Sequence, residues 1–205
     1  MKIKRKQLSF TGRPAELESV KYFVIHHTAS QNSTLESIHR WHQEGRGWYG
    51  IGYHYVITRD GDIFKGREDD QQGVHAGTFA NQESIGIALV GDFENNHPTS
   101  EQLDSLSWLF KDHLFPKHGE LVISGHNDHM NTACPGRNFP WNDLYERMDD
   151  MLDIEKTKIN MFGKEVEAIK YDSKTYIHIR ELEKIQFKVN WENGNTEVIA
   201  KRSEE

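Results

Sequence analysis

The chain contains very little cysteine and no long apolar run. Its 205 residues include a single cysteine, Cys134, so no internal disulfide can form. Stability therefore does not depend on an oxidising compartment, which indicates a protein made and kept in a cytosol unless another system releases it. No apolar run approaches the roughly 18 residues of a membrane span, so we expect no membrane insertion.

A secretion signal is also missing from the start of the sequence. Residues 1–6 are basic, as at the start of a signal peptide, but residues 7–14 contain no continuous hydrophobic segment. We therefore expect synthesis in the cytoplasm without export by a signal peptide.

The sequence has no basic stripe. Its net charge is −7, from 25 Lys and Arg against 32 Asp and Glu. Residues 157–205 hold nine charges of each sign, so the whole imbalance falls in the first 156 residues. An acidic main part without a basic patch argues against nucleic acid as a partner.

Short apolar runs alternate with amphipathic segments over the first three quarters of the chain. Apolar runs rich in β-formers predict strands, and an apolar stripe at helical spacing predicts a helix. Asp60-Gly61 is a hairpin turn signal between two of the runs. This pattern predicts an α/β fold with a mixed central β-sheet flanked by helices. The expected strands are 21–28, 51–58, 62–67, 84–93 and 121–124, and the expected helices are 34–45, 99–117 and 141–154.

The composition changes after residue 156. Short strand-like runs follow, with Asn193-Gly194 as a hairpin turn. We therefore predict one domain over 1–156 and a small β-rich domain over 157–205.

The single cysteine lies in a polar segment, eight residues after His126. A histidine pair, His26-His27, ends the apolar run 21–28 far upstream. Catalytic zinc usually takes three protein ligands from His, Cys and carboxylate, and a thiolate favours zinc over magnesium or calcium. On spacing alone, however, an inert buried thiol is the more common arrangement, because free cysteines are often simply buried. The residues around Cys134 are therefore needed to distinguish a metal ligand from an inert buried thiol.

Six short motifs accompany these residues, and they occur in one order over about residues 20–150. They are FVIHHTA at 23–29, GIGYHYVI at 50–57, RDG at 59–61, GVHAG at 73–77, SIGI at 84–87 and HNDHMNTACPG at 126–136. Together they resemble the type-2 N-acetylmuramoyl-L-alanine amidases, a family that includes phage endolysins and the catalytic peptidoglycan recognition proteins. The resemblance implies one Zn²⁺ per chain, held by His26, His126 and Cys134.

The resemblance also implies a reaction and further site residues. The reaction is hydrolysis of the amide between N-acetylmuramic acid and L-alanine of peptidoglycan. Tyr53 matches the family's catalytic tyrosine, which hydrogen-bonds the attacking water or the developing oxyanion. Thr132 is expected to be a second catalytic residue. It lies where many phage members carry a lysine and recognition-protein amidases carry threonine, and its hydroxyl can donate a hydrogen bond but cannot supply positive charge. Ala88 lies where some members carry a glutamate. His75 is expected to line the substrate groove or else to make a loop-stabilising hydrogen bond, and Asn81 is expected to bond the glycan or the peptide or else to be a solvated turn residue.

The resemblance implies a catalytic domain over 1–156 whose partner is peptidoglycan, through both its glycan strand and its stem peptide. In phage endolysins an appendage such as residues 157–205 usually binds the cell wall, which raises the effective concentration of the enzyme on an insoluble substrate. The alternative for these residues is a stabilising or dimerising element without a ligand. The absence of a signal segment favours a phage or prophage endolysin that reaches the cell wall after holin-type release. Two alternatives remain: a protein that binds peptidoglycan without cleaving it, and a cytosolic amidase that recycles muropeptides. The sequence leaves the oligomeric state open.

Overall fold

The chain forms two units, residues Met1–Arg147 and Met148–Glu205. The computed structural model describes residues 1–119, 121–151, 155–161, 164–171, 174–176, 187–192 and 195–200. The domain boundary after residue 156 and the cell-wall role of the second part stay predictions.

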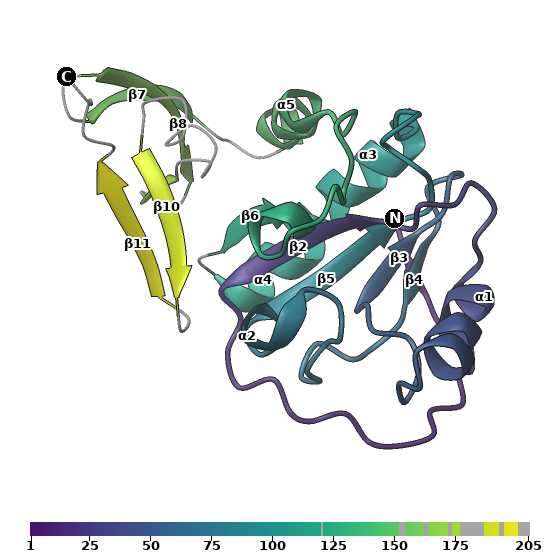
Figure 1. Cartoon of the computed structure of the whole chain (residues 1–205). Helices are drawn as coiled ribbons and strands as arrows, with labels where there is room; N and C mark the ends of the chain where they lie inside the picture. The colour runs from purple at the N-terminus through teal and green to yellow at the C-terminus, as the bar shows by residue number, and fades with distance from the viewer. Residues whose placement is uncertain are drawn as a thin grey trace. The chain divides into compact units, whose positions relative to one another are not determined.

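A six-stranded mixed sheet lies at the centre of the first unit (Figure 1), in the order β1-β4-β3-β5-β2-β6. Strand β2 pairs in parallel with β5 and with β6, β3 pairs in parallel with β5, and β3 and β4 form an antiparallel hairpin. The mixed sheet confirms the predicted α/β class. The two-residue β1, parallel to β4, was not predicted. The strands are β1 (Ile3–Lys4), β2 (Tyr22–His27), β3 (Tyr55–Ile57), β4 (Ile63–Lys65), β5 (Ser84–Leu89) and β6 (Val122–Gly125).

Helices cover both faces of this sheet. Neighbouring residues of β3 show this, because successive side chains of a strand point to opposite faces. Val56 belongs to an apolar cluster with Leu35 and Ile38 of the first helix, whereas Tyr55 hydrogen-bonds His113 on the long helical segment. The helical elements are α1 (Leu35–Arg40) continued by the π-helical η1 (Trp41–Gly45), α2 (Gly77–Asn81), α3 (Ser100–Trp108) continued by η2 (Leu109–Leu114) and α4 (Phe115–His118), η3 (His126–Asp128) and α5 (Trp141–Met151).

The three predicted helices are present, and α2 is an addition. The last helix is described through Met151, so the rest of its predicted range, 152–154, lies outside the described residues. Thr99 begins α3 with a capping box, as its spacing to Gln102 predicts. The Gln102 amide also donates to the carbonyls of Ile57 and Val90, which ties this helix to two strand ends. Among the described helices, none is both long and apolar enough to cross a membrane.

The second unit consists of β-strands in the part of the chain that is described. Three antiparallel strands pair in the order β7-β8-β9, and β10 and β11 form a separate antiparallel pair. This agrees with the predicted β-rich character, whereas the predicted Asn193-Gly194 turn lies outside the described residues. The strands are β7 (Glu155–Met161), β8 (Lys164–Tyr171), β9 (Lys174–Tyr176), β10 (Phe187–Glu192) and β11 (Asn195–Ala200).

A buried ion pair joins the hairpin β3-β4 to the helices on one face. The Asp69 carboxylate accepts hydrogen bonds from Lys65, from Lys117 on α4 and from the hydroxyl of Tyr55 at 2.6 Å. Asp69 and Lys65 have side chains that are only 3% and 5% exposed, whereas Lys117 is 52% exposed. Burial alone would raise the pKa of Asp69, but Lys65 and the three hydrogen bonds outweigh it and hold that pKa well below its ordinary value.

Replacing Asp69 by Asn should therefore destabilise the fold strongly. The change leaves the buried Lys65 ammonium without a counter-charge, which typically costs about 3–5 kcal/mol of unfolding free energy. Lys117→Met removes an exposed partner of the same carboxylate and should cost less than about 1 kcal/mol. Urea unfolding of both variants at pH 7 measures the difference, and equal losses would contradict a dominant role of the buried pair.

The same pair predicts the direction of a pH dependence. The folded-state pKa of Asp69 lies below the unfolded value of about 3.9. Its contribution is therefore fully present above that pH and is lost as the pH falls through the folded value. The stability gap between wild type and Asp69→Asn should accordingly shrink in acid.

Candidate functional site

The candidate site lies at the carboxyl ends of two neighbouring parallel strands. Ile25 of β2 pairs with Gly125 of β6, so the next residues, His26 and His126, lie side by side at the same edge of the sheet. Their ring centroids are 4.5 Å apart. Ligand sites in open α/β sheets typically form at this edge, beyond the carboxyl ends of the strands. Cys134 joins them from the loop that follows β6.

These three residues form a group that could hold a metal ion. One ligand atom from each of His26, His126 and Cys134 lies within 4.8 Å of the others. Cys134 Sγ is 3.7 Å from Nδ1 of His26, and Nε2 of His126 is buried without a hydrogen-bond partner. A buried polar atom without a partner is costly, and a bound cation can relieve that cost. Two imidazoles and one thiol, with a fourth position open, are a donor set that fits catalytic zinc.

Burial controls the protonation of this group. It lowers the pKa of His126 to about 4 and that of His26 well below its ordinary value, so both imidazoles are neutral at pH 7 and can offer a lone pair. It raises the pKa of Cys134 to about 12 when no metal is bound. The thiol must therefore lose its proton as a cation binds, so metal binding should release a proton.

Two other histidines of the sequence motifs, His27 in 23–29 and His54 in 50–57, form hydrogen bonds with the backbone. His27 Nδ1 accepts a hydrogen bond from the backbone N–H of Phe93 at 3.0 Å. His54 Nδ1 accepts from the backbone N–H of Gly86, and its Nε2 donates to the carbonyl of Gln71. Nδ1 of His27 and both ring nitrogens of His54 are engaged in this way, and neither residue belongs to the candidate metal group. The choice of His26 over His27 agrees with this geometry.

Tyr53 lies beside the candidate metal group. Its ring centroid is 5.0 Å from that of His26, and its side chain is half-buried at the site. Burial, reinforced by the nearby Cys134, raises the pKa of the phenol well above its usual range. The hydroxyl is therefore a hydrogen-bond donor at any working pH, and its assignment to catalysis stays a proposal.

Thr132 and Ala88 each lie next to one of the candidate metal ligands. The Thr132 hydroxyl accepts a hydrogen bond from the backbone N–H of Cys134 at 3.3 Å, so it shapes the loop that carries the thiol. Ala88 pairs with His26 across β2 and β5 and is fully buried. A methyl group thus occupies the position where a carboxylate could have acted as a base.

His75 and Asn81 lie next to the group but are largely buried. The side-chain oxygen of Asn81 accepts hydrogen bonds from the backbone N–H groups of His75 and Ala76, at 2.7 and 2.8 Å. His75 Nδ1 lies 3.0 Å from Nε2 of His26. Asn81 is therefore a buried residue that stabilises its loop and not a solvated turn residue, and substrate contact by either side chain stays a prediction.

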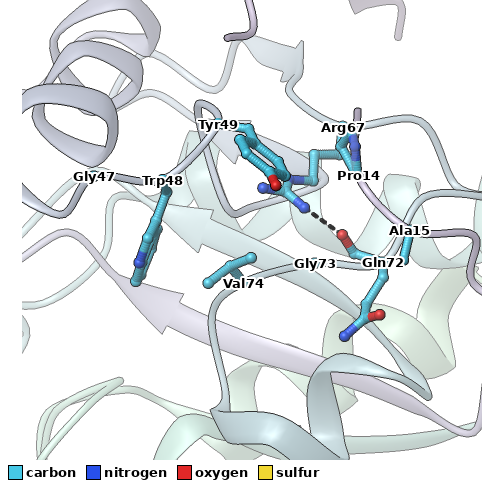
Figure 2. A pocket seen from close by; sticks show the side chains of 9 residues that line it. All are labelled: Pro14, Ala15, Gly47, Trp48, Tyr49, Arg67, Gln72, Gly73 and Val74. Atoms are coloured by element: carbon cyan, nitrogen blue, oxygen red, sulfur yellow. Dashed lines mark hydrogen bonds between the residues drawn. The ribbon is translucent and has the colours of Figure 1, made fainter. Parts of the chain in front are cut away.

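A pocket of about 340 Å³ adjoins this site (Figure 2). Arg67 is the charged side chain that lines it, and it is almost fully buried. Its guanidinium donates to the carbonyls of Ile51 and Gln72, but its Nη2 is buried without a partner in the described part of the chain. The lining residues are Pro14, Ala15, Gly47, Trp48, Tyr49, Arg67, Gln72, Gly73 and Val74.

A row of aromatic rings connects the pocket to the candidate metal group. The ring centroid of Trp48 in the pocket wall lies 4.8 Å from that of His42. The ring centroid of His42 lies 5.3 Å from that of Tyr53. The sequence alone did not identify Arg67 as a site residue. Its position after a short strand is equally typical of a surface arginine, and its burial depends on residues 14–15 and 72–74 meeting in the fold.

Comparison with known proteins supports an enzyme of one family. Residues 16–137 match the family N-acetylmuramoyl-L-alanine amidase, Amidase_2. The chain is 33% identical over 148 residues to peptidoglycan-recognition protein SC2 of Drosophila melanogaster, covering 66% of this chain and 78% of that protein. It is 35% identical over 126 residues to the endolysin of Escherichia phage T7, covering 58% of this chain and 82% of the endolysin.

Solved structures show the same relationship. N-acetylmuramoyl-L-alanine amidase LysC from Clostridium intestinale URNW superposes with a TM-score of 0.68 at 33% identity, covering 73% of this chain and 98% of that chain. Peptidoglycan recognition protein-LE, in complex with tracheal cytotoxin (monomeric diaminopimelic acid-type peptidoglycan), gives a TM-score of 0.62 at 28% identity, covering 67% and 87%. With the family match over more than half of its residues, the chain belongs to the N-acetylmuramoyl-L-alanine amidase family, Amidase_2.

Proposed function

We propose that this amidase is a zinc enzyme that lyses peptidoglycan as a phage or prophage endolysin. It would cleave the amide between N-acetylmuramic acid and L-alanine of the stem peptide. The observation that carries the proposal is the group His26, His126 and Cys134, whose ligand atoms converge within 4.8 Å beside Tyr53. A protein that only binds peptidoglycan would need neither the thiol nor the convergence.

The chemistry follows from this group and its surroundings. Zinc bound there would polarise the amide carbonyl and lower the pKa of a bound water to about 7. The two neutral imidazoles and the Cys134 thiolate would hold the ion on one side and leave the other side open to substrate. The backbone N–H of His27 donates to Cys134 Sγ at 3.3 Å, which stabilises negative charge on the sulfur.

Tyr53 would stabilise the oxyanion that develops on the amide oxygen. It is a neutral donor beside His26, placed before the reaction begins, and such preorganised donors contribute strongly when water is excluded. Thr132 is turned to the backbone N–H of Cys134 and cannot supply positive charge. Ala88 supplies no base, so Tyr53 would be the main polar side chain of this chain that acts on the transition state.

The pocket beside Tyr53 would receive the stem peptide. Its buried Arg67 offers an unpaired N–H, and a carboxylate is the ligand for which a guanidinium is best suited. The relative bound to monomeric diaminopimelic acid-type peptidoglycan supports a substrate of this kind. The side-chain carboxylate of diaminopimelic acid in the stem peptide would then bind Arg67. The amide of L-alanine in the same stem peptide would lie at the metal group.

The remaining parts of the function follow from the phage relatives. The match to the endolysin of Escherichia phage T7 supports action on the cell wall. The proposal adds holin-type release from the cytoplasm. Residues 157–205 would tether the enzyme to the wall. A muropeptide-recycling role is less well supported, because Ala88 replaces the glutamate that would serve as a base and the chain carries the additional C-terminal unit.

Zinc content and reaction products test the proposal directly. The purified chain should contain one zinc per chain and should release free L-alanine amino termini from cell walls without new reducing sugar ends. Cys134→Ser should lose most of its zinc and its activity, because it lacks the thiolate ligand. His97→Ala, at an exposed histidine, is the matched control and should keep both. New reducing ends would instead identify a glycosidase.

Tyr53→Phe should lower kcat while leaving zinc content intact. Loss of one preorganised oxyanion donor typically lowers kcat by about 100- to 1,000-fold. Tyr145→Phe, which removes the hydroxyl of a half-buried tyrosine on α5 that does not line the pocket, should leave kcat near that of wild type. Steady-state rates on a soluble muropeptide measure both, and an unchanged kcat in Tyr53→Phe would remove the tyrosine from the mechanism.

Substrate carboxylates test the role assigned to Arg67 without altering the protein. Amidation of the diaminopimelic acid side-chain carboxylate should raise KM by roughly 10- to 100-fold, the value of one charge-assisted hydrogen bond. The kcat should change little, because the contact is equal in the ground and transition states. Equal KM values for the free acid and the amide would show that the stem peptide does not reach Arg67.

A further inference from the structure

We propose that His75 is a positioning residue that holds His26 in the tautomer and orientation needed to bind the metal. The inference rests on the proposed zinc site and adds a residue that does not itself touch the ion. It assigns His75 a role behind the site instead of in the substrate groove.

The two nitrogens of His26 face different partners. Nδ1 lies 3.7 Å from the Cys134 sulfur, on the side where the three ligand atoms converge. Nε2 lies 3.0 Å from Nδ1 of His75, with both rings buried and nearly perpendicular. If Nδ1 binds the cation with its lone pair, the proton of the neutral ring must be on Nε2. His26 then donates this proton to His75 Nδ1.

That first donor fixes the direction of the remaining hydrogen bonds. Because His75 Nδ1 accepts, the proton of its own neutral ring is on Nε2, which lies 3.5 Å from the Ser84 hydroxyl. The Ser84 hydroxyl in turn donates to the backbone carbonyl of Ala80. The chain of bonds therefore runs from the metal ligand to the end of α2, and each group in it has one defined role. His75 has no free nitrogen for substrate.

The surrounding backbone makes room for the His75 ring. A Cβ at Gly73 would come within 2.4 Å of this ring, and a Cβ at Gly86 would come within 2.6 Å of it. Asn81 anchors the backbone N–H of His75 at 2.7 Å. Two glycines and one amide thus fix a single ring position, which is the support that a positioning residue requires.

The choice of partner has a chemical consequence. Metal-bound histidines usually donate their second N–H to a carboxylate, a carbonyl or water, and such partners raise ligand basicity. A neutral imidazole holds the ring equally well but adds no negative charge behind it. With Ala88 as the neighbour of His26 on β5, the only anionic group of the set is the Cys134 thiolate.

Two variants and two readouts test this role. His75→Phe keeps the ring volume but removes the acceptor, whereas His75→Asn places an oxygen close to the former Nδ1 position. Zinc affinity is measured by competition with a chromophoric chelator on the full chain. Loss of such a partner typically weakens binding by about 10- to 100-fold. We expect this loss in His75→Phe and recovery of most of it in His75→Asn, with similar melting temperatures of the two metal-free variants.

The second readout is ¹⁵N-resolved NMR of the zinc-loaded protein. A slowly exchanging proton on Nε2 of His26 is expected in wild type and in His75→Asn, and its loss is expected in His75→Phe. A wild-type spectrum in which Nδ1 of His26 carries the proton would overturn the inference even if a variant fails to fold. So would zinc affinities of His75→Phe and wild type within threefold of each other. Failure of wild type itself to bind zinc would instead overturn the proposed function.

Discussion

The register of β2 between β5 and β6 is the constraint on which the rest of this structure depends. Residues Phe23, Val24 and Ile25 are fully buried, because helices cover both faces of the sheet, so a slip by one residue would exchange the side chains that β2 packs against the two faces. The same register places His26 beside His126, and it sets Ala88 opposite His26. Core packing and the geometry of the site are therefore fixed by one set of strand pairs.

Polar groups are buried on both faces of this sheet. The desolvation cost of burying them is offset in a different way on each face. Asp69 and Lys65 stay charged because they neutralise each other and are hydrogen-bonded. The histidines near the metal group stay neutral, because burial lowers their pKa values and most bond to backbone or to one another. A bare cation is better suited to the second environment, where neutral imidazole lone pairs and a thiol that can lose its proton converge.

The sequence predicted the elements whose signals are local. A few neighbouring residues are enough to predict a strand at 21–28, a helix start at Thr99 and a turn at Asp60-Gly61. The ordered motifs indicated His26 instead of His27 as the ligand. The short β1 and the helix α2 carry too few residues for a periodic signal. The burial of Arg67 and the contact of His75 with His26 depend on pairings between distant segments, which no local pattern encodes.

The candidate ligands are far apart in the chain, because His26 and Cys134 are separated by 108 positions. A ribosome makes the chain from its amino end, so β2 emerges long before the loop that carries the thiol. A nascent fragment that ends before Cys134 cannot assemble the three-ligand group, however well its first strands pair. Lytic competence would therefore arise in a single late event, once nearly all of the first unit has left the ribosome.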